Sequence, residues 1–205
     1  MKTTKRSALV LYVIIALLFC PYTKGQDAQG FVKSLQSNFD SYETLSASFT
    51  QSSANGQGAS GKFYFKKQNS MRIELAQMTI ITDGKTVWNY NKRENKVIIS
   101  NYKEKDASLF SIPKMISTYP ASCDISLETK DKNKVVVLKP LNKKLGFKQA
   151  KLFCADAKSI NEVQITDLSD NSMTIVLSGV KINSAIDSSM FTFTIKDGIK
   201  VVDLR

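Results

Sequence analysis

The chain has 205 residues, a net charge of +11 and no histidine. Without imidazole, Ser-His-Asp and Cys-His nucleophile systems and histidine metal sites are excluded. A glycine-rich phosphate loop, EF-hand spacing and a CxxC motif are also missing, and acids such as Asp167 and Asp170 fall in expected turns. We therefore expect neither catalysis nor a bound metal or cofactor.

The first 25 residues have the pattern of a secretory signal peptide. A basic start precedes an apolar run over residues 8–20, which is too short to cross a bilayer. Small residues then precede a cleavage site after Gly25. We expect a cleaved signal peptide and a single mature domain, residues 26–205, outside the cytoplasm. An uncleaved N-terminal anchor is the alternative.

The basic charge of the mature chain is spread along its length. Cleavage after Gly25 leaves a net charge of +7, and the densest basic cluster covers residues 139–151. Because no nucleic-acid-binding motif accompanies this charge, we expect no nucleic-acid partner. Solubility, or attraction to an anionic surface or partner, explains the charge more simply.

One amphipathic helix is predicted at the start of the mature chain, over residues 27–42. Its apolar residues recur at i, i+3, i+4 and i+7 and therefore form one stripe. They are Ala28, Phe31, Val32, Leu35, Phe39 and Tyr42. From Leu45 the apolar residues alternate with polar ones, which predicts a strand.

The remaining chain is predicted to be mostly antiparallel strands, joined by short turns rich in Asp, Asn, Gly and Lys. About eleven strands in one domain indicate a large curved sheet or a barrel. Those after the first are expected at residues 61–67, 71–76, 78–82, 85–90, 96–102, 123–129, 135–139, 147–154, 160–167, 173–180 and 191–195.

The hairpin around the only tryptophan, Trp88, is apolar on both sides. With Asp83-Gly84 as a two-residue turn, Ile80 lies near Val87 on one face and Trp88 points to the other. An antiparallel sheet commonly leaves one face wet. Something must therefore cover each face of this hairpin.

One helical segment, residues 106–119, interrupts the strands. It is mostly apolar, with Pro113 in the middle, so we expect two short helical pieces with a bend. The residue pattern leaves open whether this segment is a movable lid or a plug at one end of a barrel.

The two cysteines of the mature domain, Cys123 and Cys154, are expected to lie apart. In a meander of strands, Cys123 would lie near Pro140 and Cys154 near Asn133, beyond disulfide reach. A disulfide stays open as an alternative, because this argument depends on the register.

Five segments carry a family resemblance, in this order along the chain: residues 46–51 (SASFTQ), 61–67 (GKFYFKK), 82–91 (TDGKTVWNYN), 138–140 (LKP) and 191–203 (FTFTIKDGIKVVD). Together they resemble the LolA family of periplasmic outer-membrane lipoprotein carriers. The resemblance implies a mainly β fold: an incomplete antiparallel barrel of eleven strands, with a helical lid over a hydrophobic cavity.

The function implied by this resemblance is a non-enzymatic, monomeric periplasmic carrier. It would accept acylated lipoproteins from an inner-membrane release complex, shield their acyl chains, and pass them to an outer-membrane lipoprotein receptor. Two alternatives remain. One is a related module that binds another lipid or glycolipid, and the other is a secreted β-scaffold whose apolar faces only pack on each other.

The candidate site residues are apolar. The expected acyl-chain cavity is lined by Phe49, Phe63, Phe65, Ile73, Leu75, Ile80 and Trp88, and the expected lid residues are Leu109, Phe110, Ile112, Met115 and Ile116. Which sheet face lines the cavity stays open, because a register slip of one residue inverts a strand. Matching the apolar positions places Phe63 and Phe65 on one face with Ile73 and Leu75, which requires an odd-length turn between the two strands. Lys67 stands where the family has a lid-latching arginine, and lysine lacks the multi-donor fork of arginine.

Overall fold

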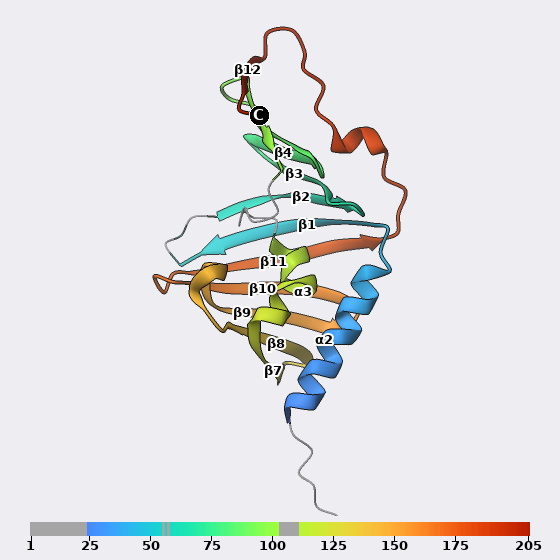
Figure 1. Ribbon diagram of the computed structural model, residues 1–205, viewed down its shortest axis with the longest axis vertical. Helices are drawn as coiled ribbons and strands as arrows, with labels where there is room; N and C mark the ends of the chain where they lie inside the picture. The colour runs from blue at the N-terminus through green and yellow to red at the C-terminus, as the bar shows by residue number, and fades with distance from the viewer. Residues whose placement is uncertain (1–23, 55, 57, 103–110) are drawn as a thin grey trace, which may run out of the picture.

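The computed structural model describes residues 24–54, 56, 58–102 and 111–205, and its centre is one twelve-stranded sheet (Figure 1). The strand order is β12-β6-β5-β4-β3-β2-β1-β11-β10-β9-β8-β7, so β12 and β7 are the two edges and the barrel is unclosed. The strands are β1 (Thr44–Ser53), β2 (Gly58–Lys66), β3 (Ser70–Leu75), β4 (Met78–Asp83), β5 (Thr86–Asn91), β6 (Lys96–Asn101), β7 (Cys123–Lys130), β8 (Asn133–Pro140), β9 (Phe147–Asp156), β10 (Ser159–Asp167), β11 (Ser172–Ile182) and β12 (Lys200–Asp203).

The eleven strands β1–β11 form antiparallel pairs, which confirms the predicted fold class. The expected strand at residues 191–195 is wrong. A 3₁₀ helix, η3 (Ser188–Phe191), lies there, and β12 pairs with β6 in parallel. The alternation of Phe191 and Phe193 is typical of a strand. In the structure this backbone pairs with none of the described strands, and both rings pack on the surface of the sheet.

The β2–β3 hairpin has the odd-length turn that the apolar pattern requires. Its turn has three residues, of which Gln68 and Asn69 adopt left-handed conformations with φ of 70° and 60°. Phe63 therefore pairs with Ile73 across the ladder. The phenylalanines of β2 and the apolar residues of β3 share one face, as predicted.

The β4–β5 turn differs by one residue from the prediction. The turn residues are Gly84-Lys85 instead of Asp83-Gly84, because the Asp83 carboxylate accepts hydrogen bonds from the amides of Lys85 (2.8 Å) and Thr86 (2.7 Å). Gly84 has a φ of 87°, which suits glycine at the first position of such a turn. The register consequently moves by two residues, and Ile80 pairs with Asn89.

Two helices, α2 (Lys24–Asp40) and α3 (Ser111–Ser117), lie on the same face of the sheet, across β7–β11 (Figure 1). We call this the inner face. Pro113 lies in the first turn of α3, where a missing N–H leaves no bond unmade, so it does not break that helix. A 3₁₀ helix, η1 (Tyr119–Ser122), follows. The predicted first helical piece falls in residues 103–110, outside the described part.

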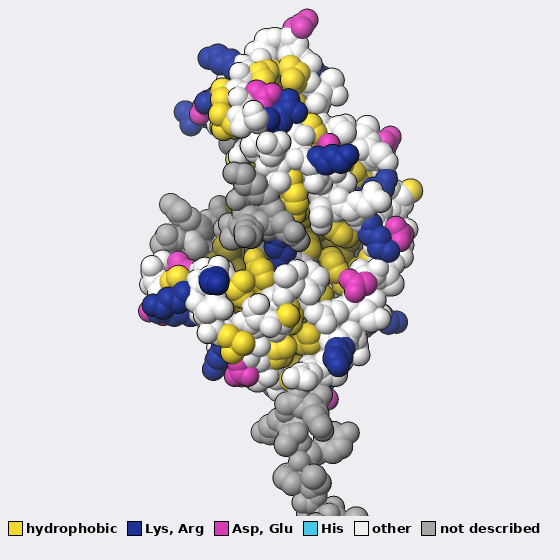
Figure 2. Space-filling view, viewed as in Figure 1, with side chains coloured by type: hydrophobic (Ala, Val, Ile, Leu, Met, Phe, Trp, Pro, Cys, Tyr) yellow, Lys and Arg dark blue, Asp and Glu magenta, His cyan; other side chains and the backbone are white. Residues whose placement is uncertain are grey.

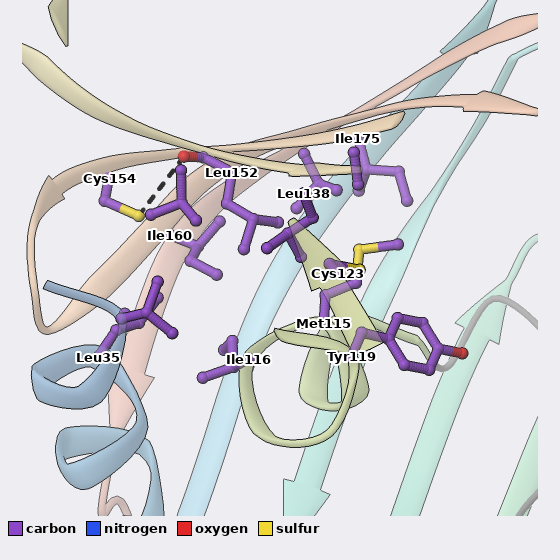
Figure 3. Close-up of a cluster of buried hydrophobic side chains, with 14 of the residues drawn as sticks. Leu35, Met115, Ile116, Tyr119, Cys123, Leu138, Leu152, Cys154, Ile160 and Ile175 are labelled. Carbon is purple, nitrogen blue, oxygen red and sulfur yellow. Dashed lines mark hydrogen bonds between the residues drawn. The ribbon is translucent and has the colours of Figure 1, made fainter. Parts of the chain in front are cut away.

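The core between helices and sheet is mostly aliphatic, with the aromatic rings of Phe49, Tyr119 and Phe147 among its members. Figure 3 shows Leu35 of α2 and Met115 and Ile116 of α3 pointing toward Leu138, Leu152, Ile160 and Ile175 of the sheet. Cys123 and Cys154 belong to this core, and both are free thiols. Cys123 pairs with Pro140 as expected, whereas Cys154 pairs with Lys134, one residue from the expected Asn133.

Residues 188–193, which include η3, pack on the opposite, outer face of β3–β5, and we call them the C-terminal segment. Phe191 is only 3% exposed, and the ring of Phe193 lies 5.1 Å from that of Tyr90. The guanidinium of Arg72 donates to the carbonyl oxygen of Met190 at 3.2 Å. This segment is the cover that the two-sided apolar hairpin requires.

Candidate functional site

Six of the seven predicted cavity residues share the inner face of the sheet. The ladder pairs Phe49 with Gly61 and Phe63 with Ile73, and it continues from Ile73 to Ile80. Since direct cross-strand partners point to the same side, the register assigns all six to one face. They are Phe49, Phe63, Phe65, Ile73, Leu75 and Ile80.

Trp88 does not join this group. It is the direct partner of Ile81, which points to the outer face and is 1% exposed. The structure thus separates Ile80 and Trp88 onto opposite sides of the hairpin. Trp88 is half-buried on the outer face, between its ladder partners Ile81 and Ile99.

Two apolar hollows lie between the inner face and the helices. The larger encloses about 530 Å³, part of it open to solvent, and the smaller about 350 Å³. Phe63, Ile112 and Leu177 line both, so the hollows are neighbours separated by these side chains. We call the two together the acyl hollow, after the acyl-chain cavity that the family resemblance predicts.

The predicted cavity residues divide into lining and flanking groups. Phe49, Phe63 and Ile73 line the acyl hollow. Phe65 packs beside it, with its ring 5.5 Å from that of Phe39. Leu75 packs against the main core from the same face.

Several lining residues were not predicted. They come from α2, the link that follows it, the start of β1, and strands β10 and β11: Leu35, Phe39, Tyr42, Leu45, Ile160, Leu177 and Val180. The sequence patterns that could have indicated these residues are the apolar stripe of α2 and the alternation in β11, because each gives its element one apolar side. The sequence did not show that these sides would meet around one space.

Helix α3 supplies the expected lid residues that the structure describes. Ile112 and Ile116 line the acyl hollow, together with Pro113, while Met115 is 2% exposed and packs in the main core. Leu109 and Phe110 lie outside the described residues.

The contact between α3 and α2 is a side-chain to backbone link. Gln36 donates from Nε2 to the carbonyl oxygens of Ile116 at 3.0 Å and Ser117 at 3.3 Å. Both carbonyl groups belong to the last two residues of α3, where no following helical N–H is available to bond them. The link thus ties the end of one cover helix to the other.

Lys67 forms a surface ion pair. Its Nζ lies 2.7 Å from Oε1 of Glu43, and both side chains are largely exposed. Such pairs contribute at most about 1 kcal/mol to stability. The latch role of Lys67 stays a prediction.

The lining of the acyl hollow contains a single charged residue among those described, Lys158, at the β9–β10 turn. This turn is fastened to the end of α2. Tyr42 donates its hydroxyl to the carbonyl oxygen of Lys158, and Asn38 Nδ2 donates to that of Ala157 at 3.0 Å. Burial, and then the charge of Asp156, raises the pKa of Tyr42, which stays a neutral donor.

The arrangement suits apolar ligands. Within the described ranges, no three His, Cys, Asp or Glu side chains come together as metal ligands, and no helix there has the length and hydropathy to span a membrane. Figure 2 shows hydrophobic side chains gathered in the hollowed middle of the face that carries the helices. What the site offers is apolar surface under a helical cover.

Comparison with known proteins gives consistent matches. The family described as "Outer membrane lipoprotein carrier protein LolA" matches residues 40–194. Outer-membrane lipoprotein carrier proteins of Histophilus somni (strain 2336) and Cronobacter sakazakii are 26% and 28% identical, over 85% and 83% of this chain and 88% and 86% of theirs. The crystal structure of an uncharacterized conserved protein from Thermus thermophilus has a TM-score of 0.61 at 16% identity, covering 86% of this chain and 99% of that one. This last likeness concerns the fold.

Proposed function

The chain belongs to the outer-membrane lipoprotein carrier (LolA) family, and on that basis we propose that it is a periplasmic carrier that shields the acyl chains of lipoproteins in the acyl hollow. It takes acylated lipoproteins from an inner-membrane release complex and delivers them to an outer-membrane receptor. It works as a monomer and performs no chemistry on its cargo. A signal peptide, residues 1–25, directs its export and is removed.

One observation carries this proposal: an apolar hollow between a sheet and two helices, with one charged lining residue among those described. Burial of each methylene contributes roughly 0.8 kcal/mol, so acyl chains bind such a lining without specific polar contacts. Binding of this kind tolerates different lipoproteins, because only the acyl chains enter the protein.

We propose that the acyl hollow opens when α3 moves away from the sheet. It touches the sheet through Ile112, Met115 and Ile116 and is tied to α2 through Gln36. Moving one short helix exposes the lining of both parts of the hollow, because Ile112 borders each. Lid opening and closing would then set the release rate of the cargo.

The test uses two adjacent residues of β11 that point to opposite faces. Leu177 lines both parts of the hollow, whereas Val176 points outward and is 44% exposed. We expect Leu177→Gln to weaken binding of a fluorescent acyl probe by about ten-fold or more, since a polar amide enters an apolar lining. Val176→Gln is the matched control and should leave binding unchanged.

The cargo is tested by extraction of a radiolabelled lipoprotein from spheroplasts that contain the release complex. The mature protein should form a soluble complex with it, and Leu177→Gln should not. Failure of the wild-type protein in this assay contradicts the carrier function. Probe binding without extraction would favour the alternative of a module for another lipid or glycolipid.

A further inference from the structure

The β8–β9 loop presents an exposed leucine from a well-anchored backbone. The Leu141 side chain is 71% exposed, the highest value among large hydrophobic residues in the described part. Its N–H donates to the Ser122 carbonyl at 3.0 Å, and the Asn142 side chain accepts from the Lys144 amide at 3.0 Å. Leu145 of the same loop packs against the main core. The loop therefore packs one leucine, half-buried, on the core and exposes the other.

Lysines flank the displayed leucine. Lys139, Lys143 and Lys144 are exposed, and none of them forms an ion pair with another described residue. Asp124 lies directly opposite Lys139 in the β7–β8 ladder, but their side chains form no ion pair. The charge around Leu141 is thus positive and available.

The β10–β11 turn adds a second exposed leucine at the same end of the sheet. Leu168 is 42% exposed. The turn lies beside the β8–β9 loop because Asp167 pairs with Phe147 in the ladder and Asp170 accepts from Lys148 at 2.6 Å. The acids of this turn are therefore engaged within the protein. In Figure 1 both connections reach the left end of the sheet, and Figure 2 shows lysine and hydrophobic side chains together there.

We propose that this end of the sheet docks on membranes that contain anionic phospholipids. The docking surface consists of Lys139, Leu141, Lys143, Lys144 and Leu168, and we call it the basic rim. Its lysines are attracted to the negative surface potential, and its leucines enter the boundary between headgroups and acyl chains. Separate leucines on projecting loops suit a soft bilayer better than a protein partner, whose interface core needs a contiguous apolar patch.

The basic rim is separate from the acyl hollow, since none of its residues lines that space. The proposal therefore does not depend on the carrier function. For a carrier, such docking would hold the protein at a membrane while cargo enters or leaves.

Co-sedimentation of the mature protein with vesicles tests the proposal. We expect binding to phosphatidylcholine vesicles with about 30% phosphatidylglycerol and much weaker binding to pure phosphatidylcholine. Raising the salt from about 0.05 to 0.3 M should weaken the binding, because exposed charges are screened. Leu141→Ser should reduce the affinity by about ten-fold through lost apolar burial. The double variant Lys143→Glu, Lys144→Glu should reduce it at least as much and remove the preference for anionic lipid.

The controls make equivalent changes elsewhere on the surface. Leu204→Ser alters another exposed leucine, and the double variant Lys132→Glu, Lys134→Glu reverses two exposed lysines at the opposite end of the β7–β8 hairpin. Both should bind vesicles like the wild type. Leu177→Gln should also bind normally, which separates docking from filling of the hollow. Absence of binding to anionic vesicles, or equal losses in the controls, overturns the proposal.

Discussion

The side-chain amide of Gln36 donates to the carbonyl oxygen of Ile116 at 3.0 Å, and so joins the two helices that cover the acyl hollow. Gln36→Ala should lower the free energy of unfolding by about 1 kcal/mol. Amide hydrogen exchange in α3 should become faster, and a bound acyl probe should dissociate several-fold faster. Ser34→Ala is the control, because the Ser34 hydroxyl donates within α2 to the carbonyl oxygen of Gly30. Equal probe dissociation in both variants would show that this link does not restrain α3.

The packing of the C-terminal segment on the outer face should stabilise the fold without affecting ligand binding. Phe191 belongs to the C-terminal segment and is 3% exposed where it packs on the outer face, so Phe191→Ala should lower the free energy of unfolding by about 3 kcal/mol in denaturant titrations. Its affinity for an acyl probe should equal that of the wild type. Ile195→Ala, at a residue that is 51% exposed, should change stability by less than about 0.5 kcal/mol. A loss of probe binding in Phe191→Ala would mean that the two faces are coupled.

Two glycines should respond to alanine in opposite directions. A Cβ at Gly61 would overlap the carbonyl oxygen of Glu74 and lie 3.0 Å from ring carbons of Phe49, so Gly61→Ala should destabilise the protein by about 2 kcal/mol or more. At Gly30, in α2, a Cβ would meet nothing within 4 Å. Gly30→Ala should therefore stabilise the protein by about 0.5–1 kcal/mol through helix propensity. Thermal unfolding of both variants measures the two effects, and the same sign in both would contradict the prediction.

Burial raises the pKa of the Cys154 thiol to about 12, with a further contribution from the charge of Asp156. The unfolded chain loses this proton near pH 9, so stability should fall as the pH rises from about 9 to 12 and be unaffected by this thiol below pH 9. Cys154→Ala should show a shallower fall in denaturant titrations over that window. In the native protein Cys154 should react with thiol reagents only on unfolding. Identical pH slopes for the two proteins would contradict this.

Much of the fold follows from local patterns. The stripe from Phe31 to Phe39 predicts α2, and alternation with short turns predicts most of the strands, because each period reflects one buried side of an element. An odd-length β2–β3 turn also follows, since Phe63 and Ile73 share a face only if the number of turn residues is odd, and the structure has three. The family resemblance then relates these elements to a carrier.

Other features depended on contacts between distant segments. Phe191 and Phe193 alternate with the period of a strand, but their rings pack on the outer face of the sheet. The last strand, β12, comes later in the chain and pairs with β6. The acyl hollow likewise joins residues from α2, α3 and β11 that no local pattern connects.

For this protein, the sequence alone determined which segments have one or two apolar sides, including both sides of the hairpin that holds Ile80 and Trp88. The tertiary structure decided which side faces the helices and which faces the C-terminal segment. The physical reason is that periodicity is a property of neighbouring residues. The assignment of a face requires the ladder register and the packing of segments far apart in the chain.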